Sequence, residues 1–133
     1  MDPSDSEAIE RFVRGTLGCS CPDEVFNSLA IERVHGPDAS VPYVRLLVGN
    51  RLLIYVLEAQ DPGLVRAAVS KLVRQGREER DRIGLNRFRL VLAAGHPTPA
   101  PTAAAVSLAD GIDLDDRAHL HVIAAGLVPA SLR

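Results

Sequence analysis

The first helical pattern of the chain lies near its N-terminus. Ser4 and, three residues later, Glu7 have the spacing of a capping box, and Gly18 stands where a glycine commonly ends a helix. We therefore predict an amphipathic helix that packs on a core. Its buried side is formed by apolar residues at helical spacing: Ala8, Ile9, Phe12, Val13 and Leu17.

A β-hairpin is predicted around the dipeptide Gly49-Asn50, after a first candidate strand at residues 29–34. Apolar segments flank this dipeptide on both sides, and its composition indicates a two-residue turn. Such a turn pairs Leu46 with Leu53. Both faces of the hairpin are mostly apolar, so we expect at least one of its strands to be covered on both sides.

A long helix and another strand follow the hairpin. Asp61 and Pro62 are suited to the start of a helix over residues 61–84, and residues 86–95 form the strand. A crossover of this kind predicts two parallel strands. Gly76, inside the helix, marks either a close helix–sheet approach or the start of fraying. The predicted buried stripe consists of Val65, Val69, Leu72, Val73 and Ile83.

The C-terminal third contains a loop, a strand and a tail. Residues 96–106 hold three prolines within eleven residues, which favours a loop. Residues 119–126 form the final strand, and residues 127–133 are interpreted as a tail. The order of elements predicts a single α/β (α+β) domain over residues 1–133. We expect a mixed sheet of about five strands, with a β-hairpin and helices packed against it.

Composition narrows the function classes. An apolar fraction of 47% and a charged fraction of 24% are typical of a globular protein, and the net charge of −2 gives no reason to expect nucleic acid. No apolar run approaches the length of a membrane span. The acidic start, MDPSDSEAIE, has no pattern of an export leader, so we expect a cytoplasmic protein with reduced thiols.

The most pointed motif is the pair Cys19 and Cys21, directly before Pro22. Pro22 favours the first position of a short helix, and a thiolate at a helix start has a lowered pKa. Two thiols at this spacing could bind zinc, copper or iron, or exchange disulfides. Asp23 and Glu24 oppose a thiolate there. The alternative is two small apolar residues that pack at a helix junction.

Histidines supply weaker candidates for metal binding. His119 and His121 are two apart in a predicted strand, so they share a face. The alternative is an ordinary solvated strand face. His96 follows a strand at the end of the sheet where ligands usually bind. A mixed site with the cysteines could include His35, His96, His119 or His121.

Arginines on the strand after the long helix suggest an anion site. Arg87 and Arg89 share one face of that strand and could bind an anion together with Asn86. The alternative is a strand edge that charge protects from aggregation. We interpret the mixed charges of residues 74–82 as a solvated helix end with surface ion pairs.

Three hypotheses about function follow. The first is thiol-based redox or metal handling through Cys19 and Cys21. The second is a non-catalytic homodimeric interaction module with structural cysteines, because an apolar hairpin tends to be covered by a partner. The third and weakest is an enzyme with a small-molecule pocket near His96, Arg87 and Arg89. The sequence does not decide whether the protein is an enzyme.

Overall fold

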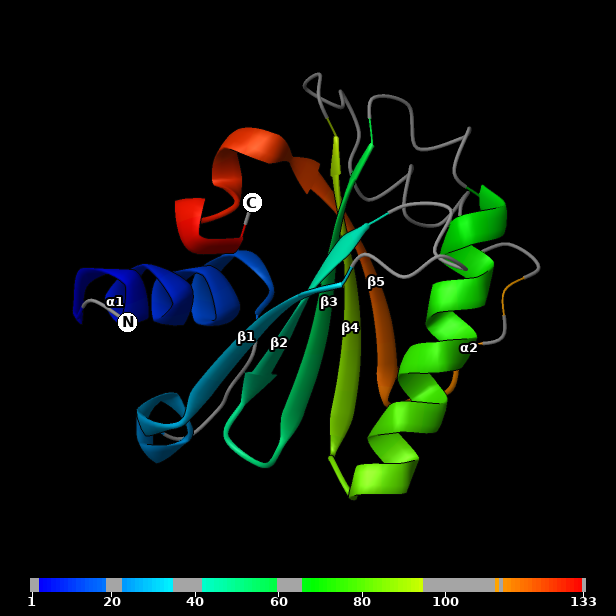
Figure 1. Cartoon of the computed structure of the whole chain (residues 1–133), viewed down its shortest axis with the longest axis horizontal. Helices are drawn as coiled ribbons and strands as arrows, with labels where there is room; N and C mark the ends of the chain where they lie inside the picture. Colours follow the sequence, from blue (N-terminus) through cyan, green and yellow to red (C-terminus); the bar gives the residue numbers. More distant parts are fainter. Residues whose placement is uncertain are drawn as a thin grey trace.

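A five-stranded mixed sheet with a helix on each face forms the domain (Figure 1). This computed structural model describes residues 3–18, 23–34, 42–59, 66–94, 112 and 114–132. It confirms the predicted α+β fold. The strands are β1 (Leu29–Val34), β2 (Tyr43–Val48), β3 (Leu52–Ala59), β4 (Arg87–Ala94) and β5 (Ala118–Ala124), and the helices are α1 (Pro3–Arg11) and α2 (Arg66–Ile83).

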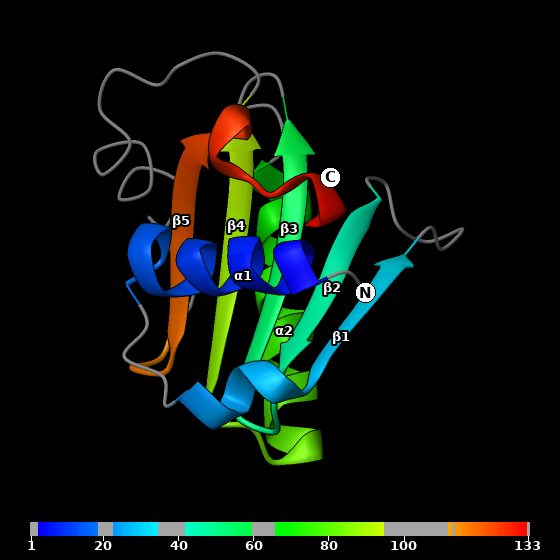
Figure 2. The same cartoon turned by 90° about the vertical axis from the view of Figure 1, so that its left-hand side faces the viewer.

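The strands lie side by side in the order of the sequence. The pairs β1–β2 and β2–β3 are antiparallel, whereas β3–β4 and β4–β5 are parallel. The predicted hairpin and the predicted parallel crossover through α2 are therefore confirmed. Figure 2 shows α1 lying across the strands on one face, with α2 behind the sheet.

The predicted two-residue hairpin turn is wrong. Val48 pairs with Leu52, so the turn comprises the three residues 49–51, and Leu46 lies opposite Ile54 instead of Leu53. A favoured two-residue turn of type I′ needs two residues at positive φ, and only Gly49 has one (58°). Both hairpin faces are mostly apolar, so the hydrophobic pattern hardly distinguishes the observed register from one shifted by a single residue.

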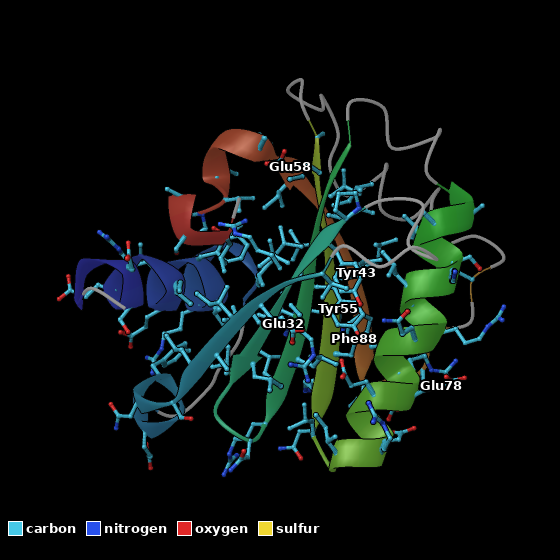
Figure 3. All side chains as sticks on the ribbon, viewed as in Figure 1. Glu32, Tyr43, Tyr55, Glu58, Glu78 and Phe88 are labelled. Carbon is cyan, nitrogen blue, oxygen red and sulfur yellow. The ribbon has the colours of Figure 1, made fainter. Side chains whose placement is uncertain are left out.

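The core on the α2 face is closed by aromatic rings. The Tyr43 and Tyr55 ring centroids are 4.6 Å apart, and Phe88 meets Tyr55 edge-on at 4.9 Å (Figure 3). A Cβ built on Gly76 would lie 2.2 Å from the Phe88 ring. Gly76 therefore marks a close approach of α2 to the sheet, which is one of the two predicted explanations.

The segment 74–82 of α2 is not simply solvated, contrary to our interpretation. Arg80 has only 1% of its surface exposed. Its guanidinium donates hydrogen bonds of 2.8 and 2.6 Å to the carboxylate of Asp115 and one of 3.0 Å to Asp81. Helical spacing alone did not reveal this contact because Asp115 lies 35 residues away in the chain.

The core on the other face combines both ends of the chain. Helix α1 continues as a π-helical turn, Phe12–Thr16, and Gly18 has a φ of 75°, as expected of a glycine that ends a helix. The C-terminal segment is not a tail, because Val128 and Leu132 are 2% and 1% exposed. It folds into short 3₁₀ turns that pack on the face covered by α1 (Figure 2).

Candidate anion-binding site

Four basic side chains gather on one face of β4 and β5. Arg87 and Arg89 are two apart in β4, and His119 and His121 are two apart in β5, with Arg89 in register with His119. Residues two apart in a strand share a face. Arg89 also donates a hydrogen bond of 3.0 Å to the carbonyl of Leu17, so this is the face that α1 covers.

Each arginine contacts one histidine. The Nη1 atom of Arg87 lies 3.1 Å from Nε2 of His119, and Nη1 of Arg89 lies 2.9 Å from Nε2 of His121. A guanidinium has only donors, so both Nε2 atoms accept and both rings carry their proton on Nδ1. Arg87 also donates to the carbonyl of Asp116 at 3.3 Å, on the exposed side of the site.

Arg89 is the buried member of the group. Only 9% of its surface is exposed, and its Nε atom is buried without a hydrogen-bond partner. Its two hydrogen bonds run to neutral acceptors, the carbonyl of Leu17 and the ring of His121. Within the described part of the chain, no carboxylate forms an ion pair with it.

The turn after α1 positions the carbonyl that holds Arg89. The backbone N–H of Leu17 donates to the carbonyl of Phe12 at 3.0 Å, the five-residue spacing of a π-helical turn. Such turns frequently occur at functional sites. Gly18, in the left-handed region, then ends the helix, so the Leu17 carbonyl is free to accept from Arg89.

Burial and mutual repulsion disfavour the charged forms of these groups. Burial, together with the charge of Arg87, lowers the pKa of Arg89. Burial, followed by the charges of Arg89 and His119, lowers the pKa of His121 to about 4. The pKa of His119 is lowered by burial and by both arginines. At neutral pH the site therefore holds two cations beside two neutral imidazoles.

The contacts of the two histidines oppose the predicted metal site. A metal would need the Nε2 or Nδ1 lone pair of a neutral ring, and both Nε2 atoms already accept from arginines. A nearby guanidinium also repels a metal cation. Among the described residues, no group of three or more His, Cys, Asp or Glu is placed to hold a metal.

The remaining predicted metal or redox residues lie outside the described residues. These are Cys19, Cys21, His35 and His96. Asn86, the predicted third member of the anion site, donates its backbone N–H to the carbonyl of Arg51 at 2.8 Å. The structure thus brings together Arg87, Arg89 and the histidine pair, which the sequence analysis had assigned to two separate sites.

Sequence reasoning missed the pairing of arginine with histidine. The available signal was the matching alternation, Arg-x-Arg in one strand and His-x-His in the next. Using it required knowing that β4 and β5 are neighbours in this register, and a segment of 23 residues, 95–117, separates them in the chain.

The fold and the site define an α+β domain with a basic cluster on a parallel strand pair. Comparison of the sequence with models of known protein families and with curated proteins finds no match. In the segments that the structure describes, no helix combines the length and the hydropathy that a membrane span requires.

Proposed function

We propose that this domain binds a small oxyanion at Arg89, with Arg87, His119 and His121 around it. The observation that carries the proposal is the burial of the Arg89 guanidinium against neutral acceptors alone. A buried charge costs several kcal/mol unless an opposite charge compensates it. A bound oxyanion would provide that charge and accept from the unpartnered Nε–H.

Binding of simple anions tests this function. Thermal unfolding of the full chain is followed at pH 7.5 with increasing acetate or sulfate, at constant ionic strength set by chloride. We expect either anion to raise the midpoint, because a ligand that binds only the folded state stabilises it. Arg89→Met should abolish the rise. Arg74→Met, which removes an exposed arginine from α2, should keep it.

Two results would contradict the proposal. One is a midpoint that neither anion changes in the unmodified chain. The other is an equal rise in Arg89→Met, because binding would then occur elsewhere. If Arg89→Met fails to fold, Arg89→Gln, which keeps a polar side chain but removes the charge, replaces it in the comparison.

Thiol chemistry at Cys19 and Cys21 stays a second candidate. It rests on the spacing of the two cysteines and on their place directly before Pro22. A thiolate at a helix start has a lowered pKa and is the reactive and metal-binding form. Metal content per chain, measured on protein purified without oxygen or chelator, tests it against Cys19→Ser/Cys21→Ser.

The expected result for a metal site is stoichiometric zinc, copper or iron that the double variant lacks. Metal in neither protein would remove the metal form of this hypothesis. Thiols that also react no faster with an exposed-thiol reagent than free cysteine would remove the redox form. Packing cysteines would then be the remaining explanation. The predicted cytoplasmic location fits reduced thiols and stays a prediction.

The homodimeric interaction module also stays a prediction, but the apolar hairpin no longer supports it. It was inferred from the apolar hairpin, but β2 and β3 lie inside the sheet, and their apolar side chains pack in the cores on both faces. The hairpin therefore needs no partner to be covered. A homodimer would have to use another surface, and sedimentation of the full chain over a range of concentrations measures it directly.

A further inference from the structure

We propose that the oxyanion is a monocarboxylate with a small apolar body, and that the Nε–Nη2 edge of Arg89 holds its two oxygens. This inference rests on the proposed function and names its ligand class. It follows from three observations: which donors of Arg89 are used, how much positive charge the site presents, and which side chains surround it.

The hydrogen bonds of Arg89 leave one edge of its guanidinium unused. Nη1 has two hydrogens, and it has two acceptors, the carbonyl of Leu17 at 3.0 Å and Nε2 of His121 at 2.9 Å. Nε has no partner, and Nη2 has no hydrogen bond to any residue that the structure describes. The N–H groups of Nε and Nη2 are parallel, and this edge matches the two oxygens of a carboxylate.

The charge at this edge suits a monoanion. Arg89 supplies one positive charge, and the imidazole beside it is neutral because His121 accepts from Nη1. Arg87, the second cation, lies at the exposed end of the site and is held by His119 and the carbonyl of Asp116. A monocarboxylate would form a neutral pair with Arg89 alone, whereas a phosphate dianion would also need the charge of Arg87 at the exposed end of the site.

On the β3 side and further along β4, the neighbours of Arg89 are apolar, whereas His119 and His121 lie on the β5 side. Ile54 of β3 is its register partner, and Val91 is the next residue on the same face of β4. Both are fully buried, as is Leu17 above them apart from 4% of its surface. These side chains offer no hydrogen-bond donor to the further oxygens of phosphate or sulfate, but they can contact a short hydrocarbon chain.

A ligand series on the unmodified chain tests the class. Dissociation constants at pH 7.5 are measured by calorimetry for acetate, butyrate and inorganic phosphate, at constant ionic strength. We expect butyrate to bind more tightly than acetate, and phosphate to bind at least about ten-fold more weakly than butyrate. The tripeptide Ala-Ala-Val with a free or an amidated C-terminus distinguishes a peptide end from a free small acid as the source of the carboxylate.

Arg89→Lys tests the edge itself, because lysine keeps the charge but has no pair of parallel donors. We expect at least a ten-fold loss of butyrate affinity, with Arg74→Lys as the matched surface control. Phosphate binding as tight as butyrate binding would overturn the carboxylate class and leave oxyanion binding intact. Absence of binding by every anion, or butyrate affinity unchanged in Arg89→Lys, would overturn this inference. The first of these would also overturn the proposed function.

Discussion

Two buried arginines of this domain have opposite surroundings. Arg80 donates to the carboxylates of Asp115 and Asp81, and their hydrogen bonds raise its pKa despite burial. Arg89 has only neutral acceptors among the described residues, and burial lowers its pKa. Arg80 therefore has a structural role, whereas Arg89 is a candidate ligand-binding residue.

Removing the partner of Arg80 should destabilise the fold. Asp115→Asn leaves the buried guanidinium with Asp81 alone, and we expect a loss on the order of 2 kcal/mol in the free energy of unfolding. Urea denaturation measures it. Asp116→Asn changes the neighbouring, exposed carboxylate and should have little effect. Equal losses in the two variants would contradict the assignment.

Histidine 121 should make stability depend on pH. Its pKa is lowered to about 4 by burial and by the charge of Arg89, against about 6.5 in the unfolded chain. The unfolded state therefore binds the proton first as pH falls. The contribution of neutral His121 to the stability of the fold is fully present above about pH 6.5 and is lost as pH falls toward 4.

Urea denaturation of His121→Gln tests this dependence. Most carboxylates titrate below pH 5. Between pH 7 and pH 5 we therefore expect the free energy of unfolding of the unmodified chain to fall by on the order of 1 kcal/mol more than that of the variant. Identical slopes of stability against pH for the two proteins would show that His121 is not held neutral by its surroundings.

At the scale of elements, α2 depends on a residue without a side chain. Gly76→Ala would place a methyl group 2.2 Å from the Phe88 ring, which is itself packed against Tyr55. We expect the free energy of unfolding to fall by about 2 kcal/mol because of overpacking, although alanine is the better helix former. Gly15→Ala, where nothing lies within 4 Å, is the control and should be close to neutral. An unchanged midpoint of denaturation for Gly76→Ala would contradict the close approach.

The elements themselves were largely predictable because each has a strong local signal. Alternating or continuous apolar residues gave β1, β4 and β5 to within about two residues, which is the usual uncertainty of a boundary. The hairpin register was not predictable, because both of its faces are mostly apolar. The tail was misread because Val128 and Leu132 are isolated apolar residues that only the tertiary fold buries.

At the scale of the whole molecule, the candidate site is assembled from three distant parts of the chain. Leu17 follows α1, Arg89 lies in β4 and His121 lies in β5. The sequence predicted that Arg87 and Arg89 share a face, and separately that the two histidines do. It could not predict the contact between the arginines and the histidines, because β4 and β5 pair with each other although they are far apart in the sequence.

Direct observation of the Arg89 Nε–H by proton–nitrogen NMR tests oxyanion binding at Arg89. We expect a resolved resonance, because this N–H is buried, and a shift of that resonance when acetate is added at pH 7.5. Arg89→Lys assigns the signal by removing it. If the chain remains folded and the resonance does not shift at the highest acetate and sulfate concentrations, oxyanion binding at Arg89 is contradicted.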